Sequence, residues 1–244
     1  MPPSRPEPPI ERPAQALREE AHAGASFLRR HGWPLLLLFA GLLLPLWGFA
    51  ELAEEVREAE GFPFDEPILL AANAMARSGF DQLFLLFSAA GYLYGVVPVD
   101  IALVLALALR RRYREGVFAA VATGGSALLN LAAKQAFARD RPSLWESIAP
   151  EHNYSFPSGH AMGSMTLAVA LVLLAWNTRW RWPVFAAMAV FVPMVGLSRV
   201  YLGVHYPSDI LAGWAAAVAW TAGVYLLVFR WGGRPWRNGA DVVQ

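Results

Sequence analysis

The eighteen residues WPLLLLFAGLLLPLWGFA, from Trp33 to Ala50, carry no charge. A run of this length is enough for a tilted or slightly short helix across the hydrocarbon layer of a membrane. The whole chain shares this character, because its 244 residues are 56% hydrophobic and 16% charged, with a mean hydropathy of +0.37. An ordinary water-soluble domain is less apolar. The surplus of apolar side chains is therefore predicted to face lipid.

Five further apolar segments follow this one along the chain. They span residues 81–109, 116–137, 160–178, 183–199 and 209–229. We therefore predict an all-α, polytopic membrane domain over residues 33–231, built as a bundle of six transmembrane helices. The second span is longer than a membrane requires, and Gly91, Gly95 and Pro98 predict a bend within it.

Residues 61–80 lie between the first two predicted spans. They combine prolines with an apolar stripe of Leu69, Leu70 and Met75. This pattern predicts an amphipathic segment that lies on the outer membrane surface.

The distribution of basic residues predicts the orientation. With the amino terminus in the cytoplasm, six spans return the carboxyl terminus to the same side, and fourteen of the twenty basic residues fall on cytoplasmic segments. This agrees with the positive-inside rule. We expect an integral, multi-pass protein of a bacterial cell (inner) membrane. A Pro-rich tail at 1–32 and a short tail at 232–244 are both predicted to be cytoplasmic, and the outer loops to face the periplasm or the cell exterior.

Charge and cysteine content exclude several kinds of function. The formal net charge of +1 provides no overall field for nucleic acid. The absence of cysteine excludes disulfides, thiolate nucleophiles and cysteine metal sites. Neither feature determines the oligomeric state.

Three outer motifs hold the polar residues that topology does not explain. The first is Lys134-x6-Arg141-Pro142 at the end of the third span. Its spacing is nearly two helical turns. Both cations are therefore predicted to project from one side of a helix that Pro142 ends.

The second motif lies in Ser155-Phe156-Pro157-Ser158-Gly159-His160, which leads into the fourth span. Free N–H groups at a helix start, with a glycine that allows close approach, form an anion site. The third motif, Ser198-Arg199-x5-His205-x3-Asp209, lies between the last two spans. Because His205 and Asp209 are four positions apart, the aspartate can begin the sixth span while its carboxylate reaches the histidine.

Together the motifs supply three cations, two histidines, an aspartate and a helix amino terminus on one side of the membrane. Cations and backbone N–H groups can neutralise phosphate oxygens, one imidazole can attack phosphorus, and the other can protonate the leaving oxygen. The set predicts phosphoryl transfer without a metal ion or other cofactor.

In order, spacing and shared outer side, the motifs resemble K-x6-RP, PSGH and SR-x5-H-x3-D, the signature motifs of the type-2 phosphatidic acid phosphatase superfamily. The resemblance implies metal-independent hydrolysis of a phosphate or diphosphate on a membrane lipid. It implies that His205 is the nucleophile that forms a phosphohistidine, that Asp209 orients His205, and that His160 is the general acid and later the base. It also implies a phosphate-binding set of Lys134, Arg141, Ser158, Gly159 and Arg199.

Two other functions remain open for the same residues. Another hydroxyl can replace water at the phosphohistidine, which would make the protein a phosphotransferase. A cationic site can also bind or transport a lipid phosphate without hydrolysing it. The substrate is open among undecaprenyl diphosphate, phosphatidylglycerophosphate, phosphatidic acid and phosphorylated lipid A, and specificity is expected to lie in residues 51–80 and 143–154.

Polar residues outside the signature positions have a structural interpretation first. Arg139 and Asp140 are expected to form a local ion pair or to lie at the surface. Loop hydrogen bonds are expected for His152 and Asn153. Asp100, inside the second span, is expected to bond to a neighbouring helix.

Overall fold

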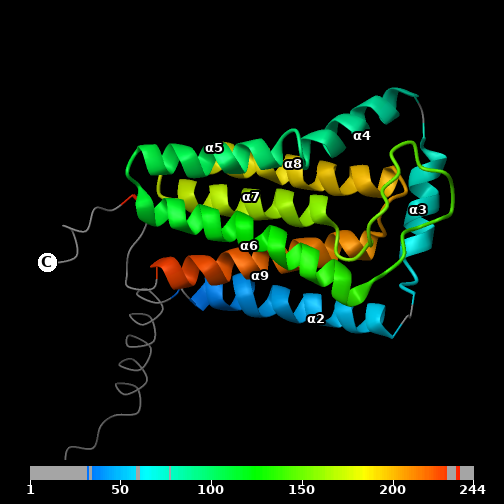
Figure 1. The fold of residues 1–244 in the computed structure, drawn as a ribbon, viewed down its shortest axis with the longest axis horizontal. Helices are drawn as coiled ribbons and strands as arrows, with labels where there is room; N and C mark the ends of the chain where they lie inside the picture. Colours follow the sequence, from blue (N-terminus) through cyan, green and yellow to red (C-terminus); the bar gives the residue numbers. More distant parts are fainter. Residues whose placement is uncertain (1–31, 33–34, 59–60, 77, 230–234, 237–244) are drawn as a thin grey trace, which may run out of the picture.

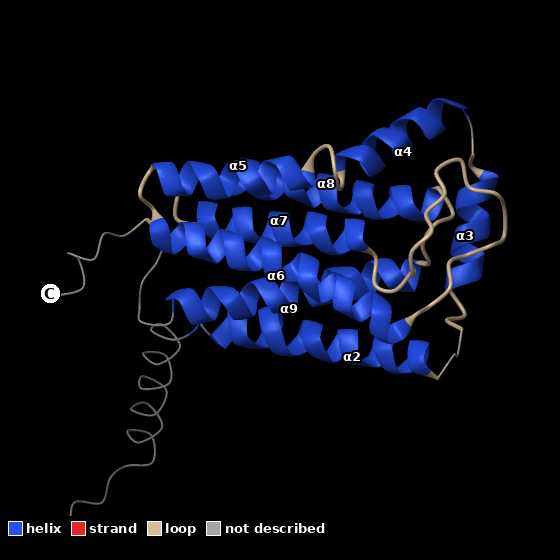
Figure 2. Cartoon of the chain, viewed as in Figure 1, coloured by secondary structure: helices blue, strands red, loops and turns tan. Residues whose placement is uncertain are grey.

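The computed structural model describes residues 32, 35–58, 61–76, 78–229 and 235–236. Every regular element within these residues is a helix (Figure 2), which confirms the all-α prediction. In chain order the helices are η1 (Leu37–Leu43), α2 (Leu44–Arg57), α3 (Asp65–Ala74), α4 (Ser78–Ala90), α5 (Val96–Leu109), α6 (Tyr113–Phe137), α7 (Gly159–Ala175), α8 (Arg181–Tyr201) and α9 (Pro207–Phe229). η1 is a π-helix that continues directly into α2. The predicted tails at 1–32 and 232–244 lie almost entirely outside the described residues.

Most of the helices run along one common axis, and α7 packs against α6, α8 and α9 (Figure 1). The apolar core between them includes Phe118 of α6, Leu173 of α7 and Phe229 of α9. Apolar side chains also cover the outside of the bundle. Leu128 of α6 is 70% exposed and Leu227 of α9 is 68% exposed. Such a surface is unfavourable in water and suits a lipid environment.

Among the described residues, four helical segments are long and apolar enough to cross a membrane: η1 with α2 over Leu37–Arg57, α6, α8 and α9. They correspond to the predicted first, third, fifth and sixth spans. α5, α7 and the Gly79–Ala90 part of α4 are apolar but shorter. The chain is therefore a multi-pass helical membrane protein.

The bend predicted within the 81–109 span is a complete break instead, because a turn at Gly91–Gly95 divides the segment into the two helices α4 and α5. A β-carbon on Gly91 would lie 2.5 Å from Val195 Cγ1 on α8, so only glycine fits where α4 meets α8. A β-carbon on Gly95 would overlap the Ala90 carbonyl group. The two glycines thus permit a tight turn in place of a gradual bend.

The predicted surface segment contains α3, which lies across one end of the bundle (Figure 1). Leu70 and Met75 are exposed, as the prediction requires. Leu69 is fully buried instead and packs against Val200 of α8 and Ile210 of α9. One face of α3 is therefore attached to the bundle.

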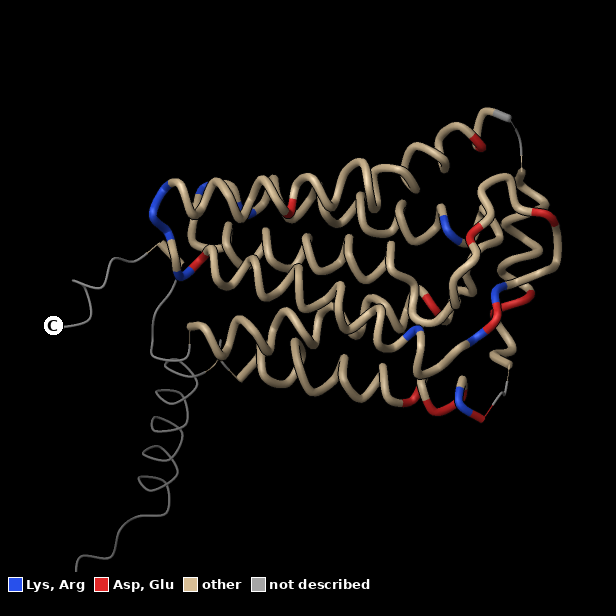
Figure 3. Tube along the Cα trace, in the orientation of Figure 1, with Lys and Arg blue, Asp and Glu red and all other residues tan. Residues whose placement is uncertain are grey.

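Charged residues gather at the two ends of the bundle (Figure 3). Arg110–Arg112 join α5 to α6, and Arg179 lies in the turn from α7 to α8 at the same end. The other end holds the loop 138–158, α3 and the turn from α8 to α9. Asp100 in α5 is an exception to this sorting. Its buried Oδ1 has no hydrogen-bond partner in the described part of the chain, so this atom does not form the predicted bond to a neighbouring helix.

Candidate active site

The three predicted motifs meet at the end of the bundle near α3. α6 carries Lys134 in its last turn, and α7 begins within the second motif. The third motif occupies the end of α8 and the turn into α9. Residues separated by up to 75 positions in the sequence therefore face one small region.

The prediction that one helix carries both Lys134 and Arg141 is wrong. α6 ends at Phe137, because Ala138 adopts a left-handed backbone with φ of 46°. A left-handed residue at this position is a common way to end a helix. Arg141 therefore reaches the site from the loop 138–158.

The start of α7 agrees with the prediction. Ser158 is the N-cap residue, and its Oγ accepts a hydrogen bond from the Ala161 N–H at 3.4 Å. Gly159 is the first residue of the helix and His160 the second. The His160 ring lies 5.1 Å from the ring of Tyr92, which belongs to the turn between α4 and α5.

His205 lies in the turn between α8 and α9. This turn passes through Gly203, whose φ is 67° and whose β-carbon would lie 2.5 Å from the Trp145 ring, so glycine is required. His205 Nδ1 is 3.2 Å from Asp209 Oδ2, and both side chains are buried. His205 Nε2 lies 3.2 Å from Arg141 Nη1. Because a guanidinium only donates, Nε2 is the acceptor and the imidazole proton is on Nδ1, toward the aspartate.

Asp209 has three further partners. Arg139 Nη1 donates to Oδ1 at 2.6 Å, and the Tyr206 N–H donates to Oδ2 at 2.9 Å. The Ser155 hydroxyl also donates to Oδ2. The carboxylate is therefore bound on both oxygens, and its direction toward the histidine is fixed.

Arg139 connects Asp209 to Asp65 at the start of α3. Arg139 Nη2 donates to Asp65 Oδ2 at 3.0 Å, and the Ser208 N–H donates to Asp65 Oδ1 at 2.8 Å. The predicted local ion pair of Arg139 is thus wrong, since its partners come from α3 and α9. Sequence reasoning missed Asp65 altogether. The sequence did contain one signal, which was Arg139 itself. It lies two positions before Arg141 on the predicted outer side, where the positive-inside rule leads us to expect few arginines.

Lys134 reaches the site from α6, and Arg199 reaches it from α8. Arg199 is 1% exposed and Lys134 6% exposed. Lys134 donates to the Tyr154 carbonyl, and Arg199 donates to the Ser88 hydroxyl of α4. Buried cations are costly unless anions or hydrogen-bond acceptors compensate them, so the region is built to receive negative charge.

Arg141 is held by its own loop and by the turn between α8 and α9. It donates to the Asn153 carbonyl at 2.7 Å, to the Asn153 side-chain oxygen and to the Val204 carbonyl at 2.5 Å. The loop hydrogen bond predicted for Asn153 is therefore present. Burial lowers the pKa of Arg141, while the nearby carboxylates of Glu151 and Asp209 oppose that change.

Glu151 is an acidic residue that sequence reasoning did not place in the site. Its Oε2 is 2.7 Å from Arg141 Nη2, and its Oε1 forms an ion pair with Arg199. Its carboxylate oxygens also lie 3.8 Å from His160 Nδ1 and 3.9 Å from His205 Nε2. A carboxylate thus occupies the point toward which both histidines and two cations face.

Burial, with Arg141, Arg199 and Lys134 nearby, holds the pKa of His205 well below its ordinary value of 6.5. A neutral imidazole with one free lone pair is the nucleophilic form. The environment therefore favours the protonation state that attack on phosphorus requires.

A helical membrane bundle with two histidines and three cations at one end defines a membrane phosphatase by class. The comparisons with known proteins agree. The family model of the PAP2 superfamily matches residues 115–232. The undecaprenyl-diphosphatase of Sulfolobus acidocaldarius is 29% identical over 189 residues, which cover 75% of this chain and 84% of that protein.

Two further similarities involve Bacillus subtilis. Its phosphatidylglycerophosphatase B is 28% identical over 156 residues, covering 62% of this chain and 76% of that protein. The crystal structure of a transmembrane PAP2-type phosphatidylglycerolphosphate phosphatase from the same organism superposes with a TM-score of 0.66 at 25% identity. That match covers 80% of this chain and 98% of the other.

This chain belongs to the PAP2 superfamily, the superfamily of type-2 phosphatidic acid phosphatases. Its enzyme class is that of the hydrolases of phosphoric esters and diphosphates. All three regions that carry the motifs lie inside the part matched by the family model.

Proposed function

We propose that this protein hydrolyses a terminal phosphate or diphosphate on a membrane lipid, through a phosphohistidine at His205. One observation carries the proposal: His205 presents Nε2 to a group of cations while Asp209 holds Nδ1 at 3.2 Å. A neutral, oriented imidazole beside a phosphate-binding site is the arrangement that nucleophilic catalysis needs.

In the first step the Nε2 lone pair of His205 attacks phosphorus, and the bond from phosphorus to the leaving oxygen breaks. His160 gives a proton to that oxygen, which leaves as the lipid alcohol or lipid phosphate. Lys134, Arg141 and Arg199 stabilise the charge on the phosphoryl oxygens, with the Ser158 and Gly159 end of α7. Asp209 stabilises the positive charge that develops on the His205 ring.

In the second step water attacks the phosphohistidine. His160, now neutral, accepts the proton of that water, and the bond between phosphorus and Nε2 breaks. The products are inorganic phosphate and His205 in its starting form. No metal ion takes part, because the side chains themselves supply the positive charge.

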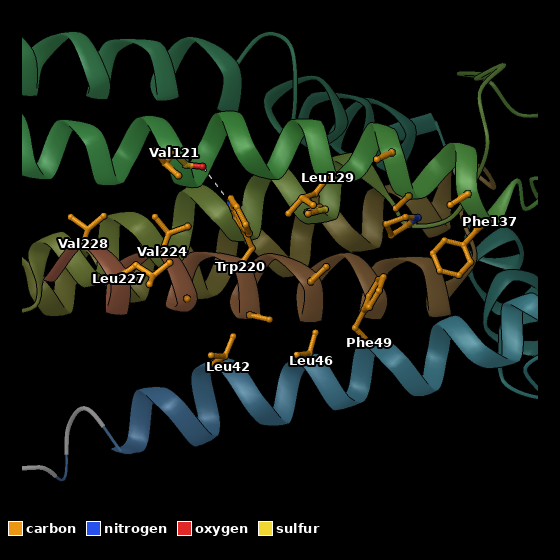
Figure 4. A pocket seen from close by; sticks show the side chains of 18 residues that line it. Leu42, Leu46, Phe49, Val121, Leu129, Phe137, Trp220, Val224, Leu227 and Val228 are labelled. Atoms are coloured by element: carbon orange, nitrogen blue, oxygen red, sulfur yellow. Dashed lines mark hydrogen bonds between the residues drawn. The ribbon is translucent and has the colours of Figure 1, made fainter. Parts of the chain in front are cut away.

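The lipid chain has a place beside this site. An apolar groove of about 760 Å³ runs between α6, α9 and the continuous helix of η1 and α2, and Figure 4 shows Leu42 of η1 and Leu46 and Phe49 of α2 pointing into it. At one end it reaches Phe137 and Pro157, which are close in sequence to Lys134 and Ser158. A hydrocarbon chain in the groove would thus leave its phosphate at the cations.

The same proposal includes six membrane crossings within residues 33–231. α4 and α5 together form the second crossing, and α7 the fourth. The arginines between α5 and α6 and between α7 and α8 support cytoplasmic turns, with both termini on that side. The site then faces the periplasm or the cell exterior at the surface of the cell membrane.

Phosphate release by the purified protein tests the proposal. The relatives named above are an undecaprenyl-diphosphatase and a phosphatidylglycerophosphatase, so we propose their two lipids, with phosphatidic acid, as the first substrates to assay. His205→Asn should lower the rate of phosphate release at least a thousandfold, which is within the range of losses seen when an enzyme loses its catalytic nucleophile. Asp140→Asn, at an exposed loop position outside the segments expected to set specificity, is the control and should keep the wild-type rate. EDTA should not change either rate.

Quenching in alkaline detergent, in which a phosphohistidine survives, separates the open alternatives. A hydrolase and a phosphotransferase both form an acid-labile, alkali-stable radiolabelled protein that His205→Asn cannot form, and an added acceptor alcohol becomes phosphorylated only by the transferase. A protein that merely binds or transports the lipid releases no phosphate and forms no labelled intermediate. Equal hydrolysis by wild type and His205→Asn would exclude the proposed mechanism.

A further inference from the structure

The Glu151 carboxylate occupies the position that the reaction needs for phosphate. It lies within 4 Å of Arg141, His160 and His205 and is paired with Arg199. In the proposed mechanism the phosphoryl group has to reach the same four side chains. Glu151 and a substrate phosphate therefore cannot occupy the site at the same time.

A carboxylate satisfies this site incompletely. It carries one charge on two oxygens, whereas a phosphate monoester carries up to two charges on three terminal oxygens. Arg199 Nε is buried, and no acceptor in the described part of the chain reaches it. Lys134 donates to a backbone carbonyl, that of Tyr154. A third oxygen and a second charge would give both cations a better partner.

The Glu151 side chain is more accessible to solvent than the cations it pairs with. Its side chain is 26% exposed, so a rotation about its side-chain bonds brings the carboxylate into water. The loop is held by other contacts, including the Ser155 N–H to the Arg139 carbonyl at 2.8 Å and the bonds from Arg141 to Asn153. A side-chain movement of Glu151 would leave these loop contacts in place.

We propose, resting on the function proposed above, that Glu151 is an internal competitor that keeps phosphodiester headgroups out of the site. A phosphodiester has one charge and two terminal oxygens, as the carboxylate has, so it gains little by displacing Glu151. A terminal phosphate or diphosphate gains the contacts to Lys134 and Arg199 Nε and displaces it. Because most headgroups of a phospholipid bilayer are phosphodiesters, the competitor keeps the site available for the rarer substrate.

The first test measures the inhibition constant of inorganic phosphate for four purified proteins: wild type, Glu151→Gln, Glu151→Asp and Asp140→Asn. Glu151→Asp retains the charge but is one methylene too short to reach Arg199 and the histidines together. Both Glu151 variants should bind phosphate roughly tenfold more tightly, the factor expected if the open form is about a tenth of wild-type molecules. Asp140 is exposed on the same loop, and its variant should match wild type.

Competition by lipid tests the selectivity. Vesicles of phosphatidylglycerol should slow hydrolysis by Glu151→Gln and leave the wild-type rate unchanged. Glu151→Gln also leaves Arg199 without its carboxylate, so phosphate should raise its unfolding midpoint more than that of wild type. This second measurement applies even to a poorly active variant.

Several results would overturn the inference. A wild-type inhibition constant in Glu151→Asp would mean that charge alone matters, and an unchanged constant in Glu151→Gln would mean that Glu151 does not compete. Failure of the proposed function looks different. In that case the wild type itself neither binds inorganic phosphate nor releases it from any lipid.

Discussion

Arg139 and Asp209 form an ion pair of 2.6 Å between the loop 138–158 and the first turn of α9. The Asp209 side chain is completely buried, and that of Arg139 is 15% exposed. Since the same guanidinium also binds Asp65, it neutralises two carboxylates that would otherwise repel each other. The orientation of His205 thus depends on a residue that does not face the phosphate site.

Replacing Arg139 should therefore reduce turnover more than substrate binding. In Arg139→Gln we expect kcat to fall about tenfold to a hundredfold, or ~1.4–2.8 kcal/mol of transition-state stabilisation, with little change in KM. Breaking the pair should also destabilise the fold by ~3–5 kcal/mol, because a buried carboxylate loses its partner. Steady-state kinetics and unfolding in detergent measure the two effects. The neighbouring exposed Asp140→Asn is the control, and an equal loss of kcat there would argue against positioning.

Kinetics should distinguish the role of His160 from that of His205, because the two histidines act in different steps of the proposed reaction. With a lipid analogue whose leaving group is a phenolate of low pKa, protonation is not needed and the first step should survive in His160→Asn. The second step still needs a base, so labelled phosphohistidine should accumulate while phosphate release falls by about 10²–10⁴-fold. Rapid quenching with radiolabelled analogue measures both. A variant that releases phosphate at the normal rate without accumulating the intermediate would assign the base to another residue.

The lowered pKa of His205 predicts activity under acidic conditions. The neutral form is the active one, and it is lost only when the pH falls through the folded-state pKa, which lies well below 6.5. The acid limb of kcat/KM should therefore lie below pH 6.5, after correction for the separately measured ionisation of the substrate. In the unfolded chain this histidine binds a proton near pH 6.5, whereas in the folded protein it stays neutral to a lower pH. Its contribution to the free energy of unfolding should therefore decrease as the pH falls below 6.5. An acid limb at or above 6.5 would contradict the assignment.

The apolar groove predicts a chain-length effect. Ala132 lines the groove on α6, whereas Ala120 is exposed on the same helix but does not line it. Ala132→Trp should raise KM for a long-chain lipid phosphate about tenfold, equivalent to ~1.4 kcal/mol of lost chain binding. Ala120→Trp should not, and a short-chain phosphate should not distinguish the two variants. Equal KM values for the long-chain lipid would place the chain elsewhere.

The sequence alone predicted the class of fold and the gathering of the motifs because both depend on local patterns. Long apolar runs predict membrane helices, and the four-residue spacing of His205 and Asp209 predicts their contact. The residues that support the site depend on tertiary pairing instead. Nothing near Asp65 indicates that it would meet Arg139 from 74 positions away.

Two errors have local physical causes. The end of α6 depends on the backbone of Ala138, a residue type that normally continues a helix, so propensity predicted the wrong boundary. The break between α4 and α5 depends on close contacts of Gly91 and Gly95, which only the packed structure reveals. Glu151 was missed because an acidic residue in an outer loop is usually a solvated one.

α7 begins at the site and has seventeen residues, which makes it about 26 Å long at 1.5 Å per residue. The hydrocarbon layer of a bilayer is roughly 30 Å thick. We therefore expect the histidines to be recessed a few ångströms below the headgroup plane. A lipid would reach them by sinking slightly and moving sideways, with its chain still in the bilayer. The protein would then avoid the work of extracting a hydrocarbon chain into water, which a water-soluble enzyme acting on the same lipid would have to supply.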